Sequence, residues 1–138
     1  MKFKPKGEDL IIVDLKKVED LYNIKLPLSY NEFMLKYNGM NPSKEYFFKP
    51  DIWEEKFYFE YLLSIKYGRY NLERANIRGI KSFPENHLTI GHVEGGTISL
   101  SLKKQDYGSI HVFYSDGEMY KLADSFTEFL DGLEELEY

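Results

Sequence analysis

Three histidines, His87, His92 and His111, are the side chains of this sequence best suited to metal binding or proton transfer. His92 and Glu94 form an H-x-E pair, but the sequence has no H-E-x-x-H and no Pro-Cys-x-x-Cys to complete a deaminase zinc site. On the strand expected near residue 111, His111 falls on the face opposite the apolar Val112. We therefore expect each histidine to be solvated or to lie at a sheet edge, and we expect no metal site.

The hydroxyl and carboxylate groups do not form a recognisable catalytic motif either. No serine lies in G-x-S-x-G, and Ser125 is better placed to cap a helix. The pairs Glu54–Glu55 and Asp116–Glu118 have the character of surface carboxylates, because no aromatic cleft is implied between them.

The glycine-rich segment Glu94-Gly95-Gly96 lacks the spacing of a phosphate-binding loop. It is better interpreted as a turn between two strands, where glycine tolerates positive φ. The chain also has no cysteine, which excludes a disulfide, a thiolate metal site and a cysteine nucleophile, and which fits a reducing cytosol. The sequence thus predicts a protein that is not an enzyme and that needs no cofactor.

A protein-binding surface is the functional site that the residue types favour. Trp53 stands among carboxylates in an expected loop, and an aromatic anchor surrounded by negative charge suits a basic protein partner. The alternative is that Trp53 folds back over the core. The candidate binding residues are Asp51, Trp53, Glu54, Glu55, Asp116 and Glu118.

The net charge of −5 is concentrated at the C-terminal end, where residues 94–138 hold 10 Asp and Glu against 3 Lys. This balance argues against phosphate binding and fits a basic partner. The carboxylates after residue 130 are better explained as the solvated face of a terminal helix. Tyrosines near Lys66, Arg69 and Arg74 raise the alternative of base stacking, but the acidic balance and the absence of an RNP motif argue against nucleic acid.

The hydrophobic pattern predicts helices before and after a block of strands. We expect helices at residues 9–22 and 29–38, a short one within 70–79, and a closing helix with Phe126, Phe129, Leu130 and Leu133 on one face. Strands are expected at residues 57–63, 88–93, 97–102, 110–114 and 119–122, and residues 40–56 mostly as loop.

Two serines are placed to begin helices. Ser29 with Glu32, and Ser125 with Glu128, have the spacing of a capping box, and Leu28 could form a hydrophobic staple with Phe33. Gly39 is expected as the left-handed residue that ends the second helix.

These elements predict an α+β fold, with a mostly antiparallel sheet and helices packed on one face, in a single domain spanning residues 1–138. In the strand at 97–102, Ile98, Leu100 and Leu102 are expected to face the core, and Thr97, Ser99 and Ser101 the solvent. The apolar run Leu10–Val13 is too short for a signal peptide or a membrane span. We therefore expect a cytoplasmic protein with no membrane partner.

Ordered motifs along the chain resemble the SUKH superfamily, which includes fungal Smi/Knr-type cell-wall regulators and many bacterial immunity proteins. The matching motifs are Leu26-Pro-x-Ser-Tyr-x-x-Phe33, Tyr37-Asn38-Gly39, Pro84, Ile90-Gly91, Gly95-Gly96, Ile98-Ser-Leu-Ser-Leu102, Asp106-x-Gly108-x-Ile110 and Leu122-Ala-x-Ser-Phe-x-x-Phe-Leu130. The strand after Gly108 ends in Phe113-Tyr114-Ser115-Asp116 instead of the usual tryptophan-like or Trp-Asp ending.

The resemblance implies a non-enzymatic binding domain with the SUKH fold. In bacteria such a domain is typically an antitoxin that binds and occludes a cognate polymorphic or contact-dependent toxin, often a nuclease. The fungal branch implies the alternative, a regulatory scaffold of the Smi/Knr cell-wall type. The compact chain favours the immunity role, with a cognate toxin of basic surface as the expected partner.

Overall fold

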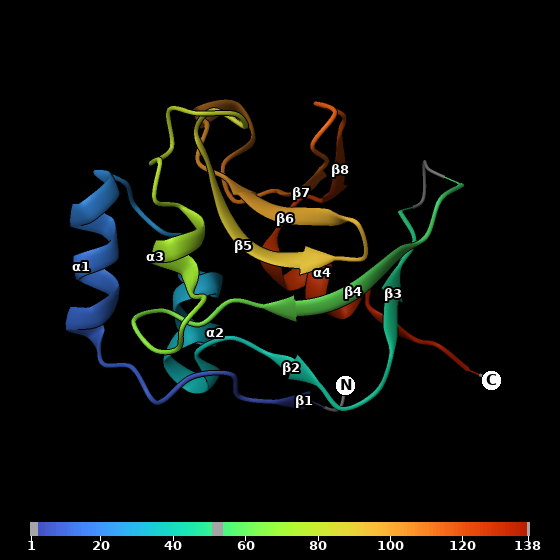
Figure 1. The fold of residues 1–138 in the computed structure, drawn as a ribbon, viewed down its shortest axis with the longest axis horizontal. Helices are drawn as coiled ribbons and strands as arrows, with labels where there is room; N and C mark the ends of the chain where they lie inside the picture. Colours follow the sequence, from blue (N-terminus) through green and yellow to red (C-terminus); the bar gives the residue numbers. More distant parts are fainter. Residues whose placement is uncertain (1–2, 51–53, 138) are drawn as a thin grey trace.

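A curled antiparallel sheet organises the chain (Figure 1). The computed structural model describes residues 3–50 and 54–137. Within these residues seven strands form the sheet, in the order β8 (Met119–Ala123), β7 (Ile110–Phe113), β6 (Gly96–Ser101), β5 (His87–Val93), β4 (Phe57–Leu62), β3 (Tyr46–Phe48) and β9 (Glu134–Glu135). A separate pair joins β1 (Phe3–Lys4) to β2 (Asn41–Pro42). The helices are α1 (Ile12–Tyr22), α2 (Leu28–Tyr37), α3 (Leu72–Ala75) and α4 (Phe126–Asp131), with a 3₁₀ turn at Lys104–Asp106.

The core lies between one face of the sheet and the helices α2 and α4. Tyr30 and Phe33 of α2 pack against Phe126 of α4, with ring centroids 5.2 Å apart in both pairs. Phe129 of α4 stacks on Phe48 of β3 at 5.4 Å. Aromatic pairs at these separations add to the stability gained by burying apolar surface. The α+β prediction, with an antiparallel sheet and helices on one face, is confirmed.

The start of α2 differs from the prediction. The N-cap is Pro27, and Ser29 lies inside the first turn and makes no side-chain cap. Leu28 is 74% exposed, so the expected hydrophobic staple with Phe33 does not form. The fixed φ of proline prepares the entry to this helix, which leaves no capping role for Ser29.

The end of α2 is close to the prediction. Asn38 takes the left-handed conformation as the C-cap, and Gly39 follows with φ +95°. A Cβ on Gly39 would lie 2.9 Å from the carbonyl oxygen of Leu62, so both the conformation and the close approach favour glycine.

Helix α4 begins as its sequence predicts. The Glu128 N–H donates to Ser125 Oγ at 3.1 Å, and Glu128 Oε2 accepts the N–H of Asp124 at 3.1 Å. Helix α1 begins at Ile12, later than expected, because the Asp14 carboxylate accepts the Ile11 N–H at 2.9 Å and fixes the start there.

Two other predictions were wrong in part. Residues 40–56, expected as loop, contain β2 and β3. The acidic C-terminal segment, which the solvated-helix interpretation placed on a terminal helix, forms strand β9 against β3, with Glu134 opposite Phe47. Pairing with a neighbouring strand decided the structure of these short segments, and that pairing has no local sequence signal.

The second face of the sheet is also partly covered, which overturns the outward assignment of two serines. Ser99 and Ser101 are fully buried. The connection from α3 to β5 is anchored over this face by the Asn76 side chain, which accepts the Thr89 N–H at 2.8 Å and donates to the Thr89 carbonyl at 2.9 Å. In the part of the chain that the structure describes, no helix is both long and apolar enough to cross a bilayer.

Candidate protein-binding surface

Three connections meet at one end of the sheet, because strands β3 to β8 are antiparallel neighbours. They are the β3–β4 connection, the β5–β6 turn and the β7–β8 turn, all on the side of Figure 1 away from α1. Their exposed carboxylates belong to Glu54, Glu55, Glu94, Asp116 and Glu118, and we call this set the acidic end.

Three of the sequence-predicted residues surround a pair of tyrosines at this end. Tyr114 and Tyr120 have ring centroids 6.2 Å apart, and the Tyr120 hydroxyl donates to Glu118 Oε2 at 2.8 Å. That hydrogen bond, with the charge of Glu55 beside it, raises the pKa of Tyr120 to about 12. Both phenols therefore stay neutral at pH 7 and offer hydroxyl groups among carboxylates.

The same carboxylates act on Tyr114. Burial raises its pKa first, and the charges of Glu55, Glu118 and Asp116 raise it further. The structure thus places Glu55, Asp116 and Glu118 close enough for their charges to act on the same tyrosine, although Glu55 is more than 60 residues away from the other two in the sequence.

Backbone hydrogen bonds hold the β7–β8 turn in shape. The Asp116 carboxylate accepts the Glu118 N–H at 2.9 Å, and the Tyr114 N–H donates to the Glu118 carbonyl at 3.0 Å. Gly117 has φ +92°, a conformation in which glycine carries no strain. Asp116 therefore shapes the turn in addition to contributing charge.

The other predicted residues are placed less closely. Glu54 is exposed in the β3–β4 connection, and the carboxylates that raise the pKa values of the tyrosine pair are those of Glu55, Asp116 and Glu118. Asp51 and Trp53 lie outside the described residues, so the two alternatives for Trp53 stay open.

Sequence reasoning missed Glu94, Tyr114 and Tyr120 as members of this surface. A usable signal was present, because the strands predicted at residues 88–93, 97–102, 110–114 and 119–122 leave short connections at 94–96 and 115–118. Turns that follow alternate strands lie at the same end of a sheet, so Glu94 could have been grouped with Asp116.

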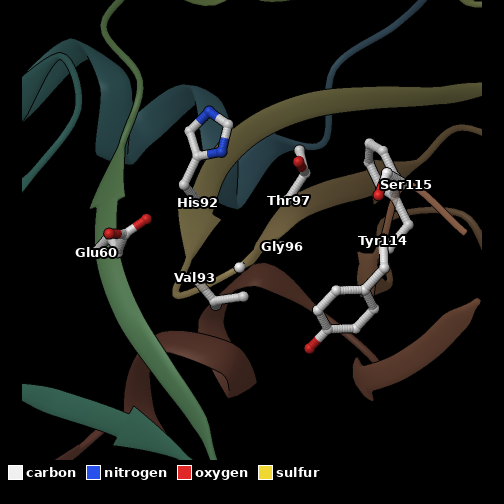
Figure 2. Close-up of a pocket in the computed structure, with 9 residues that line it drawn as sticks. Glu60, His92, Val93, Gly96, Thr97, Tyr114 and Ser115 are labelled. Atoms are coloured by element: carbon white, nitrogen blue, oxygen red, sulfur yellow. The ribbon is translucent and has the colours of Figure 1, made fainter.

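A shallow pocket of about 320 Å³ opens beside this end, between β4, β5, β6 and β7 (Figure 2). His92 and Thr97 point to one side of the sheet there, and Val93 and Tyr114 to the other. The Tyr70 hydroxyl lies 3.1 Å from His92 Nε2. Burial lowers the pKa of His92, so the ring is neutral at pH 7 and fits hydrogen bonding to a ligand or partner.

A buried polar cluster lies on the covered face of the sheet, and it corrects the prediction that every histidine is solvated or lies at a sheet edge. His87 is 4% exposed, with Nδ1 lying 3.0 Å from Ser99 Oγ, and its ring meets that of His111 edge-on at 4.9 Å. Burial, with the neighbouring His111, lowers the pKa of His87 to about 4.

The cluster contains Ser, His and Asp, but its geometry is not that of a catalytic triad. Ser109 Oγ and Asp106 Oδ2 approach the same nitrogen of His111, Nε2, at 2.9 and 3.3 Å. In a triad the carboxylate and the serine bind opposite nitrogens of the ring. Burial alone would raise the pKa of Asp106, but the hydrogen bond from Ser101 and the two neighbouring histidines outweigh it and lower the pKa. The cluster therefore serves to satisfy buried polar groups.

Metal binding finds no support in the geometry of the described residues. Within residues 3–50 and 54–137, no three His, Asp or Glu side chains are arranged to hold a metal ion.

Comparisons with known proteins agree with the fold and with the order of the motifs. The sequence model of the SMI1/KNR4 family (SUKH-1) matches residues 12–132, from the start of α1 to the end of α4. Comparison with curated proteins and with solved structures gave no match. The matched segment contains most of the core and all three connections of the acidic end, and the chain therefore belongs to the SMI1/KNR4 family (SUKH-1).

Proposed function

We propose that this protein is an immunity protein that binds a cognate bacterial toxin through its acidic end. The family includes immunity proteins, and the clustering of Glu55, Asp116 and Glu118 around Tyr114 and Tyr120 is the observation that carries the proposal. The partner's contact surface is basic, and a nuclease is the toxin class that best fits, since its substrate-binding cleft is cationic.

Electrostatics and aromatic contact have separate roles in this interface. Exposed carboxylates attract a cationic partner at long range and raise the association rate. Because they remain solvated, each ion pair adds little net affinity. The half-buried rings of Tyr114 and Tyr120 supply the apolar contact that holds the complex together.

Inhibition in this account is by occlusion. The acidic end covers the toxin's substrate-entry face, so the substrate phosphates are excluded by bulk and by like charge. No chemical step on the toxin is needed, and Asp51, Trp53 and Glu54 join the interface from the β3–β4 connection.

The experiment is capture of partners by the tagged full-length protein from its native cells, followed by mass spectrometry. A stoichiometric partner that ends in a small, basic, toxic domain, and whose toxicity is relieved by co-expression of this protein, is the expected result. Several signalling or cytoskeletal partners without a toxin would contradict the immunity role and favour the regulatory scaffold. Toxicity that persists during co-expression would also contradict it.

A further inference from the structure

A groove of about 810 Å³ runs between the two outer parts of the curled sheet. Residues 121–124, at the end of β8, form one wall, and Phe48, Lys49 and Pro50 form the other. Helix α4 closes the groove with Glu128 and Asp131, and Glu134 of β9 completes the lining. This groove is distinct from the acidic end, whose carboxylates are not among its lining residues.

Strand β8 presents backbone hydrogen-bonding groups to this groove. Among the described residues, β7 pairs with one edge of β8 and no strand pairs with the other. The Tyr114 N–H donates to the Glu118 carbonyl, so the alternation of an antiparallel ladder turns Glu118 and Tyr120 toward β7. The N–H and C=O groups of Met119 and Lys121 are therefore directed outward. An unpaired edge of this kind is a template for another strand.

The charge of the groove selects the kind of strand. Four carboxylates line it, from Asp124, Glu128, Asp131 and Glu134, against the ammonium groups of Lys49 and Lys121. Lys121 is already paired with Asp124. The remaining carboxylates leave the groove negative, and Leu122 and Phe48 add buried apolar surface at its walls.

We propose that the groove is a strand-addition site, in which an extended basic segment of a partner polypeptide pairs with the outer edge of β8. Backbone hydrogen bonds to Lys121, which lines the groove, and to Met119, just beyond its lining residues on the same strand edge, give the affinity. Lysine or arginine side chains reaching Asp131 and Glu134 give the selectivity. Every second residue of the added strand faces α4, and these residues are the basic ones. The residues between them are apolar, so the segment alternates basic and apolar residues. The site does not depend on the proposed immunity role, because it involves different residues.

The probe for this site is a seven-residue peptide of alternating lysine and valine, titrated into the isotope-labelled full-length protein and followed by NMR. We expect amide shifts confined to β8, β9 and α4, with slower exchange of the Lys121 N–H. A matched peptide of alternating glutamate and valine is expected to bind at least about tenfold more weakly. Equal binding of the two peptides would overturn the assignment, as would shifts that map elsewhere.

Two variants separate the backbone contact from the side chain. Lys121→Pro removes an N–H that faces the groove and not β7, and we expect it to weaken the lysine peptide about tenfold. Lys121→Ala keeps that N–H and should bind at least as well as the parent. Equal affinity of these two variants would contradict strand addition.

If the proline variant does not fold, Asp131→Lys with Glu134→Lys provides the test, and Asp9→Lys, at an exposed site outside the groove, is its control. Here the double variant should lose binding and the control should keep it, whereas retention by both would contradict the proposal. Concentration-dependent shifts at β8 without peptide would instead assign the edge to a second copy of this chain.

Discussion

At the scale of single residues, the covered face of the sheet shows most clearly that hydrogen-bond partners decide whether a polar side chain can be buried. His87, Ser99 and Ser101 have the alternation of solvent-facing strand residues, yet all three are buried. Their polar atoms are satisfied by one another and by Asp106, whose Oδ1 accepts a short hydrogen bond from Ser101 Oγ at 2.5 Å. A fully paired polar cluster can be buried at little cost, whereas an unpaired one cannot.

The neutral state of His87 gives a pH prediction. Its pKa is about 4 in the folded protein against 6.5 in the unfolded chain, so the unfolded chain binds the proton first as the pH falls. The contribution of His87 to stability should fall by about 3 kcal/mol between pH 6.5 and 4, measured by urea unfolding. His87→Gln should flatten this dependence and His92→Gln should change it less. A parent protein with constant stability over this range would contradict the assignment.

At the scale of helices and strands, the structure shows which local sequence patterns predicted an element correctly. Ser125 caps α4 as the sequence predicts, but the same pattern at Ser29 is overruled by Pro27, which begins α2 one residue earlier. Long periodic segments were predicted well, since burial of one face decides their structure. Strands β2, β3 and β9 were missed because each is two or three residues long and exists only by pairing with a distant segment.

The two serines provide a matched pair of variants. Ser125→Ala removes the oxygen that accepts the Glu128 N–H and should lower the free energy of unfolding by about 1 kcal/mol. Ser29→Ala removes no cap and should change it by less than about 0.5 kcal/mol. Chemical denaturation of both variants checks this, and equal effects would show that the capping assignment is wrong.

The bulge in β5 depends on Gly91. The register with β6 shifts between Thr89 and Gly91, and a Cβ on Gly91 would lie 2.5 Å from the Tyr61 carbonyl oxygen. Gly91→Ala should therefore destabilise the protein by about 3 kcal/mol, because the neighbouring strand must move. Gly95→Ala has open space around the new Cβ but φ +75°, so it should cost only about 1 kcal/mol. A lower melting temperature for Gly95→Ala than for Gly91→Ala would contradict the close approach of Gly91 to the Tyr61 carbonyl.

At the scale of the whole molecule, charge is divided between the two ends of the sheet. The connections at residues 49–56, 94–95 and 114–118 carry six Asp and Glu against two Lys. The connections at the opposite end, residues 63–86 and 102–109, carry seven Lys and Arg against three Asp and Glu. Such a separation of charge orients the molecule as it approaches a charged partner. Salt screens the attraction, and at 0.1 M the screening length is about 10 Å.

The sequence predicted part of the candidate site for a topological reason. Asp116 falls in the short connection between the strands predicted at 110–114 and 119–122, and Glu55 in the loop predicted at 40–56, but nothing in the sequence says that these two segments meet. Their meeting depends on β4 and β7 being separated by only two strands in the sheet. The pairing order is a property of the whole fold, and local patterns do not contain it.

The most direct test of the account is the affinity for the captured toxin, measured by calorimetry at about 50 mM and about 500 mM salt. Glu54→Lys with Glu55→Lys should weaken binding at least about tenfold at low salt and flatten its salt dependence. The control, Asp9→Lys with Glu85→Lys, makes the same charge change at exposed sites away from the acidic end and should leave the affinity close to that of the parent. Unchanged affinity of the Glu54/Glu55 variant at both salt concentrations would contradict binding through the acidic end.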